Sequence, residues 1–208
     1  MTNATKIAFL SAALAAFMLP AAAQTSGGTV PSTTPAPNPT TIQQRKENQQ
    51  DRIANGIGSG QLTAGEAANL EKKESNLNQE EKLMRSEDNG HLTSADRGVL
   101  NQQQNQLSNQ IYKDKHNAAV QNTDPRSEVG QRQRNQQERI AQGIQSGQMT
   151  AGEAARAERN QAAVNKEIRT DRAANGGHLT QAERQQINRQ QNHNSKQIYK
   201  EKHNGRHQ

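Results

Sequence analysis

The sequence predicts an all-α protein with two tandem three-helix repeats after a disordered linker rich in Pro and Thr. Three observations lead to this fold class: an internal duplication, a helix start signal that occurs four times, and apolar residues spaced by three, four or seven positions. Leu, Ile and Val make up only 22 of the residues from 24 to 208. The repeats are therefore expected to be helix hairpins with a thin, polar core.

Residues 1–23 have the features of a signal peptide. Lys6 precedes an apolar run of 13 residues, Ile7–Leu19, and Pro20 is followed by three alanines that suit cleavage after Ala23. The run is shorter than the roughly 20 apolar residues that a membrane-spanning helix needs. The protein is therefore expected to be periplasmic or secreted, with no integral membrane segment after cleavage.

The remainder of the chain consists of a linker and a duplication. Residues 24–44 contain four prolines among Thr, Ser and Gly, which favours a disordered linker. Residues 45–117 (copy 1) align without a gap on residues 132–204 (copy 2) at a shift of 87, with 40 identities in 73 positions. A second linker, 118–131, joins the copies, and residues 205–208 form a tail.

Each copy contains two places where a Thr stands three residues before an acid, the pattern of a helix-capping box. In this box the Thr oxygen accepts from the backbone N–H of the acid, and the carboxylate accepts from the backbone N–H of the Thr. Each pattern follows a Gly that can adopt a positive φ and end the preceding helix. The boxes are Thr63/Glu66, Thr93/Asp96, Thr150/Glu153 and Thr180/Glu183. They predict helices over about 45–58, 64–87 and 94–116, with equivalents in copy 2.

Copy 2 has lost several of the apolar residues of copy 1. The replacements are Leu70 by Ala157, Met84 by Asp171 and Leu107 by Asn194. Losing this much buried aliphatic surface costs on the order of several kcal/mol. Copy 2 is therefore predicted to be the less stable half.

The charge also differs between the copies. Copy 1 carries 10 basic and 11 acidic residues, whereas copy 2 carries 13 and 7. A basic second half can associate with anionic surfaces such as lipid headgroups or polysaccharide. The candidate contact residues are Lys196, Tyr199, Lys200 and Lys202. Because each copy has a single aromatic residue for base stacking, nucleic acid is not expected as a partner.

Two twelve-residue segments, 55–66 and 142–153, resemble the calcium-binding loop of EF-hand proteins. Gly stands at the sixth place and Glu at the twelfth place of both. The resemblance implies oxygen ligands from Asn55, Ser59, Glu66, Gln142, Ser146 and Glu153. The third place, where the family has Asp or Asn, is occupied by Ile57 or Ile144. The same segments also fit capping boxes that need no metal, so both interpretations stay open.

Nothing in the sequence indicates catalysis. Cysteine is absent, which also excludes disulfides and thiolate zinc sites, and there is no glycine-rich phosphate-binding loop or marked nucleophile. The protein is therefore predicted not to be an enzyme. No cofactor is expected, apart from calcium under the EF-hand interpretation.

Residues 91–97 and 178–184 read His-Leu-Thr-Ser-Ala-Asp-Arg and His-Leu-Thr-Gln-Ala-Glu-Arg. They resemble the motif of the small periplasmic LTxxQ stress proteins of Gram-negative bacteria, with Asp96 and Glu183 in place of the Gln of the motif. The resemblance implies an all-helical, cradle-like periplasmic chaperone or envelope-stress sensor that is often dimeric. The whole chain resembles a bacterial family of secreted helical-repeat proteins.

The sequence therefore favours an exported, non-enzymatic helical interaction protein with an envelope-stress or chaperone-like role. Its expected partner is another protein or a second copy of itself. Calcium binding through the EF-hand-like loops is the alternative, and polyanion binding through copy 2 is a third hypothesis.

Overall fold

The computed structural model describes residues 41–207, and this part of the chain is all helical, as predicted. The helices are α1 (Ile42–Ser59), α2 (Ala64–Glu87), α3 (Ser94–Lys115), α4 (Glu128–Gln145), α5 (Ala151–Ala174) and α6 (Gln181–Lys202). None of these helices is both long and apolar enough to cross a bilayer. The predicted signal peptide and most of the predicted first linker lie outside the described residues.

Two helices begin earlier than predicted. Helix α1 begins at Ile42 because Thr41 forms a capping box with Gln44, whose backbone N–H donates to the Thr41 hydroxyl oxygen at 3.1 Å. The side-chain oxygen of Gln44 accepts in return from the Thr41 backbone N–H at 2.9 Å. Helix α4 begins at Glu128, inside the predicted second linker, and is capped by Ser127. The pattern of a Thr three residues before an acid does not predict either start, because Gln replaces the acid at the start of α1 and Ser caps α4 alone.

The four predicted capping boxes all form at the starts of α2, α3, α5 and α6. Even the short side chain of Asp96 reaches the Thr93 backbone N–H, at 2.8 Å. Gly60, with a φ of 74°, ends α1 in the left-handed conformation as predicted. Helices α2, α4 and α5 instead end two or three residues before the predicted glycines.

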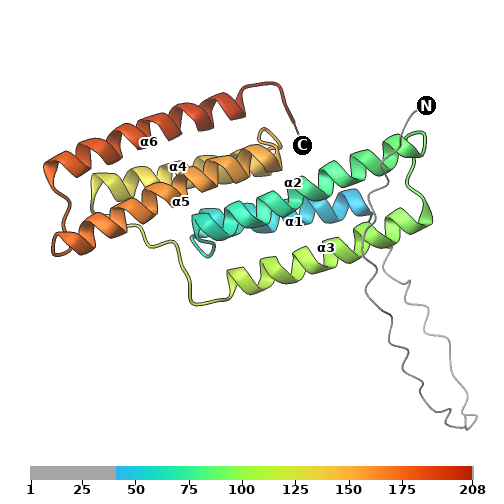
Figure 1. Cartoon of the computed structure of the whole chain (residues 1–208), viewed down its shortest axis with the longest axis horizontal. Coiled ribbons are helices and arrows are strands. Elements are labelled where there is room, and N and C mark those ends of the chain that lie inside the picture. Colours follow the sequence, from blue (N-terminus) through green and yellow to red (C-terminus); the bar gives the residue numbers. More distant parts are fainter. Residues whose placement is uncertain (1–40, 208) are drawn as a thin grey trace, which may run out of the picture. The chain divides into compact units, whose positions relative to one another are not determined.

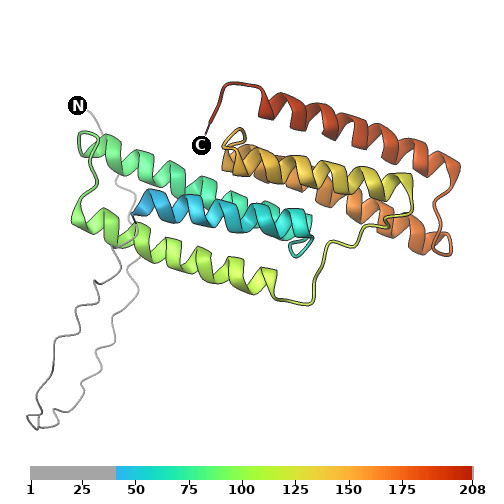
Figure 2. The same cartoon turned by 180° about the vertical axis from the view of Figure 1, so that it is seen from behind.

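The helices of copy 1 pack against the equivalent helices of copy 2. Helix α2 lies beside α5, and α1 lies beside α4 (Figures 1 and 2). Within residues 41–207, α3 packs only on α1 and α2, and α6 packs only on α4 and α5. The colours along the ribbons in Figure 1 show that α2 and α5 run in opposite directions. Because each central pair joins equivalent helices, the two copies are related by an approximate twofold arrangement.

One apolar cluster runs through both copies. Its largest fully buried members are Ile53, Ile57, Leu62, Leu70, Leu100, Ile111, Ile140, Met149 and Ile198. A smaller cluster of Val129, Val164, Ile168 and Ile187 lies between α4, α5 and α6. The sequence predicted helix hairpins with a thin core, and in the structure the main apolar cluster is shared by both copies. The other copy covers the apolar stripes of α1 and α2, whereas α3 and α6 pack on helices of their own copy.

Buried glutamines join the helices at equivalent places in both copies. The side-chain amide of Gln49 donates to the Gln104 carbonyl oxygen and to the Ser108 hydroxyl, both at 2.7 Å. Gln136 makes the same two contacts in copy 2, each at 2.6 Å. The amide N–H groups of these glutamines find partners on a neighbouring helix, which helps a Gln-rich chain to form a packed bundle.

Candidate anion-binding cleft

The two glutamates at the ends of the EF-hand-like loops are engaged by protein donors. Glu66 accepts from the Thr63 backbone N–H at 2.9 Å and hydroxyl at 2.7 Å, and from the Asn117 amide at 2.6 Å. Glu153 is held in the same way by Thr150, at 3.0 and 2.8 Å. Burial alone would raise the pKa of both carboxyls, but these hydrogen bonds outweigh it and hold each pKa below its ordinary value. Both glutamates therefore act as helix caps.

Three of the other four loop residues make side-chain hydrogen bonds within the protein. The Asn55 side-chain oxygen accepts from Gln145 of α4 at 2.9 Å. The Ser59 hydroxyl donates at 3.2 Å to the side-chain oxygen of the residue two positions further along the chain, and the Ser146 hydroxyl makes the equivalent hydrogen bond at 3.1 Å. Gln142 lies in the last turn of α4. Within residues 41–207, no group of three or more His, Asp or Glu side chains could hold a metal ion. Calcium binding stays a prediction.

The predicted polyanion residues lie along the end of α6. Lys196, Tyr199 and Lys200 are exposed and share one helix face, and the Tyr199 ring stacks on His203 with 4.2 Å between ring centroids. Lys202 is partly buried, and burial, together with a neighbouring guanidinium, lowers its pKa. None of the four predicted residues lines the basic cavity between α2 and α5.

That cavity is a cleft of about 560 Å³ between α2 and the first part of α5, which we call the basic cleft. Six lysines and arginines line it: Lys46, Lys72, Lys82, Arg156, Arg159 and Arg206. His207 also contributes to the lining, and Glu153 is the only acid there. The basic cleft thus presents six full positive charges and one negative charge.

Helix geometry places these side chains together. Lys72, Ser75 and Lys82 stand at three- and seven-residue spacing, so they follow one face of α2. Arg156 and Arg159 extend from the facing part of α5, three residues apart. The first turn of α5 also lines the cleft, and the partial positive charge of a helix N-terminus adds to the cationic character.

Three of the six cations have acidic partners and three do not. The ion pairs are Lys46–Glu81 at 3.0 Å, Arg156–Glu201 at 3.1 Å and Arg206–Glu153 at 3.6 Å. Lys72, Lys82 and Arg159 are exposed and make no hydrogen bond or ion pair within the described part of the chain. Their charges are therefore available to a ligand.

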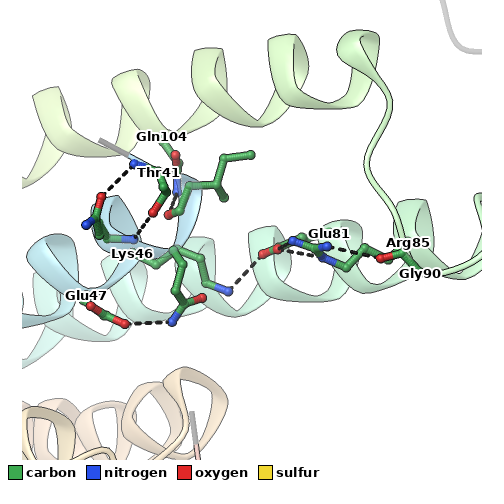
Figure 3. Close-up of polar contacts among 10 residues, drawn as sticks. Thr41, Lys46, Glu47, Glu81, Arg85, Gly90 and Gln104 are labelled. Carbon is green, nitrogen blue, oxygen red and sulfur yellow. Dashed lines mark hydrogen bonds and ion pairs between the residues drawn. The ribbon is translucent and has the colours of Figure 1, made fainter. Parts of the chain in front are cut away.

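A chain of polar contacts fixes Lys46 at the edge of the basic cleft (Figure 3). Its ammonium group reaches across from α1 to Glu81 of α2, and Arg85 contacts the other oxygen of Glu81 at 2.8 and 3.0 Å. Burial would raise the pKa of Glu81, but the hydrogen bonds from Lys46 and Arg85 outweigh it and hold the pKa below its ordinary value. Glu81 is therefore a stable anionic partner for Lys46.

The buried faces of α2 and α5 carry carboxyl groups of a different kind. Glu71 accepts only from Gln50, at 3.2 Å, and Glu158 accepts only from Gln137, at 2.9 Å. Neither oxygen of Glu74 has a hydrogen-bond partner. Burial raises the pKa of Glu71 well above its usual range, that of Glu158 to about 8 and that of Glu74 to about 7. Burial therefore favours the protonated form of all three groups.

Sequence reasoning missed both the basic cleft and the buried carboxyls. The cations of the cleft come from α1, α2, α5 and the C-terminal tail, so no local motif contains them. The glutamates did leave a signal, because Glu71, Glu74 and Glu81 continue the three- and four-residue spacing that begins at Ala67. A polar residue inside such a seam is expected to be buried.

Comparison of the chain with known protein families, with curated proteins and with solved structures finds no match.

Proposed function

We propose that this protein is an exported, non-enzymatic binding protein that takes a multivalent anion into the basic cleft. The observation that carries the proposal is the group of six lysines and arginines around one cleft, three of them without an acidic partner. Such a concentration of like charge destabilises the folded state, and a bound anion would relieve the repulsion.

The chemistry of the lining favours phosphate or sulfate groups. Arginine presents a planar fork of donors that matches tetrahedral oxyanions, and lysine adds a mobile point charge. The volume of about 560 Å³ lies within the range of small-molecule sites, so it suits a short oligoanion or one segment of a longer polymer. Because the unpaired cations are exposed, each contact is screened by solvent, and affinity depends on several charges acting together.

Binding, rather than catalysis, fits the other groups in the basic cleft. The Thr150 hydroxyl and the Glu153 carboxylate are bonded to each other at 2.8 Å, but the same two groups cap α5. Moving either one to serve a reaction would open the first turn of the helix. The envelope-stress, chaperone-like and calcium-binding roles stay predictions, since no contact among the described residues favours them over anion binding.

The test is calorimetric titration of the full-length mature chain with inorganic tripolyphosphate. We expect one ligand per chain, with an affinity that falls steeply as salt is added, because binding releases counterions. The variant Lys72→Gln/Lys82→Gln/Arg159→Gln removes the three unpaired cations and should weaken binding at least about tenfold, the equivalent of about 1.4 kcal/mol.

A matched control removes the same number and kind of charges elsewhere. The variant Arg169→Gln/Lys196→Gln/Lys200→Gln changes three exposed residues outside the basic cleft, including two of the residues predicted on α6. It should bind tripolyphosphate nearly as well as the unmodified chain. An equal loss of affinity in both variants would show that only net charge matters. A loss confined to the control variant would move the site to α6.

A further inference from the structure

Three carboxyl groups on the buried faces of the two helices that form the basic cleft have no cationic hydrogen-bond partner. Glu71 and Glu74 lie on α2 and Glu158 lies on α5, and all three side chains are 0% exposed. The duplication places Glu71 and Glu158 at equivalent positions, and the approximate twofold arrangement brings their charges within interaction range. An ionised carboxylate in such a place is costly unless a cation or several donors compensate it.

The two copies provide an internal comparison for Glu74. Its equivalent in copy 2 is Gln161, whose amide donates to the side-chain oxygen of Gln136 at 2.9 Å. In copy 1 the equivalent pair is Glu74 and Gln49, and the side-chain oxygens of both lack a hydrogen-bond partner. A carboxylate cannot donate, whereas a protonated carboxyl can make the bond that Gln161 makes. The geometry of copy 1 is therefore complete only when Glu74 carries a proton.

The surrounding charges do not compensate these groups. The charged neighbours of Glu71 are Glu74 and Glu158, and Glu74 also faces Glu81 along α2. Lys46 of α1 is the one cation that acts on Glu74, but its ammonium group is bound to Glu81 at 3.0 Å. Helices α1 and α4 otherwise contribute only neutral amides: the hydrogen bond to Glu71 from α1 and the one to Glu158 from α4 come from glutamines.

We propose that protonation of Glu71, Glu74 and Glu158 holds α2 against α5, so that the basic cleft is formed at acidic to neutral pH and loosens as these groups ionise. The proposal deepens the proposed function and rests on it, because α2 and α5 are also the two helices that carry Lys72, Lys82, Arg156 and Arg159. Acid would therefore favour anion binding without changing the charge of any lysine or arginine in the cleft.

The direction follows from proton linkage. Burial raises the pKa of Glu74 to about 7 and that of Glu158 to about 8, from an ordinary value of 4.5. Between the ordinary and the raised values the folded state binds more protons than the unfolded state, so stability falls as the pH increases. The contribution of these groups is fully present below 4.5 and is lost as the pH rises through about 7 to 8.

The first test measures thermal stability of the full-length mature chain at about pH 5.5 and about pH 8.5. Glu74→Gln installs the residue that copy 2 already has. It should raise the melting temperature at the higher pH by roughly 5 °C and leave it nearly unchanged at the lower pH. The control Glu87→Gln removes an exposed carboxylate from α2 and should change the melting temperature equally at both values. An identical response of the two variants would overturn the proposal.

The second test measures binding of a sulfated disaccharide, whose charge is constant over this pH range. All proteins carry His207→Gln, so that the lining of the basic cleft contains no histidine. Binding should weaken by roughly tenfold from about pH 6 to about pH 8.5, as expected if the closed fraction falls to about one molecule in ten. Adding Glu74→Gln should reduce this change. Equal affinity at both pH values would refute the coupling.

The two proposals fail in distinguishable ways. The sulfated disaccharide could bind at neither pH while Glu74→Gln shows its pH-dependent gain in stability. This result would refute the proposed anion site and support the role of the buried carboxyl groups. The sulfated disaccharide could instead bind equally at both pH values while Glu74→Gln has no pH-dependent effect. This result would support the anion site and refute the proposed role of the buried carboxyl groups.

Discussion

Replacing Leu70 by alanine tests whether the two copies share one core. Leu70 is 0% exposed and belongs to the same apolar cluster as Ala154 and Ala157 of the other copy. Removing its side chain loses the transfer free energy of the buried atoms and leaves a cavity that the helices can only partly close. Together these effects should lower the free energy of unfolding by about 3 kcal/mol. For a chain of this size, such a loss corresponds to a melting temperature lower by roughly 6–12 °C.

The assay is urea unfolding followed by far-UV circular dichroism, with Leu83→Ala as the control on the same helix. Leu83 is 63% exposed, so its truncation should change the free energy of unfolding by less than about 0.5 kcal/mol. Because the cluster runs through both copies, Leu70→Ala should shift a single cooperative transition. A loss below about 1 kcal/mol, or a transition that separates into two, would refute the shared core. The prediction that copy 2 is the less stable half stays a prediction.

Further substitutions probe local packing and capping. A Cβ at Gly56 would lie 2.7 Å from the branched carbon of Leu62, whereas one at Gly143 would lie 2.6 Å from the Met149 sulfur. Because a methionine can shift more easily than a buried leucine, Gly56→Ala should cost about 1–3 kcal/mol and Gly143→Ala less, as measured by thermal unfolding. Thr150→Ala removes the cap of α5 and should lower stability by about 1 kcal/mol, and it should also weaken tripolyphosphate binding. The equivalent substitution in copy 1 should have the first effect only.

The helices could be predicted because their starts are encoded locally. A Thr oxygen and a carboxylate three residues apart satisfy two backbone donors without help from the rest of the fold, so the four boxes appear in both sequence and structure. The start at Ile42 uses a capping box with Gln44 in place of the acid, and the start at Glu128 uses Ser127 alone. Both patterns give a weaker sequence signal. Pairing between the copies could not be predicted, because it depends on which narrow apolar stripes cover each other in three dimensions.

The candidate site was beyond sequence reasoning for a related reason. The charge difference between the copies suggested an anionic partner as one hypothesis, but a helix end such as Lys196–Lys202 was the only cluster visible locally. The basic cleft needs Lys46, Lys72 and Arg156 to be brought together by contacts between α1, α2 and α5. Buried glutamates such as Glu71 look like solvated helix residues until the helix that covers them is known.

Divergence between the copies explains why the chain should hold one anion site rather than two. The approximate twofold arrangement pairs every position with one in the other copy. Lys72 and Arg159 are each other's counterparts, so a second place related to the basic cleft would share these two cations with it. Three of the six cations of the basic cleft have neutral counterparts there: Gln133 for Lys46, Asn69 for Arg156 and Ala119 for Arg206. Affinity for a multivalent anion falls steeply with the number of cations that contact it, so the equivalent place is a much weaker site. Two ligands bound with equal affinity would show that the cations lost from the second place are not needed.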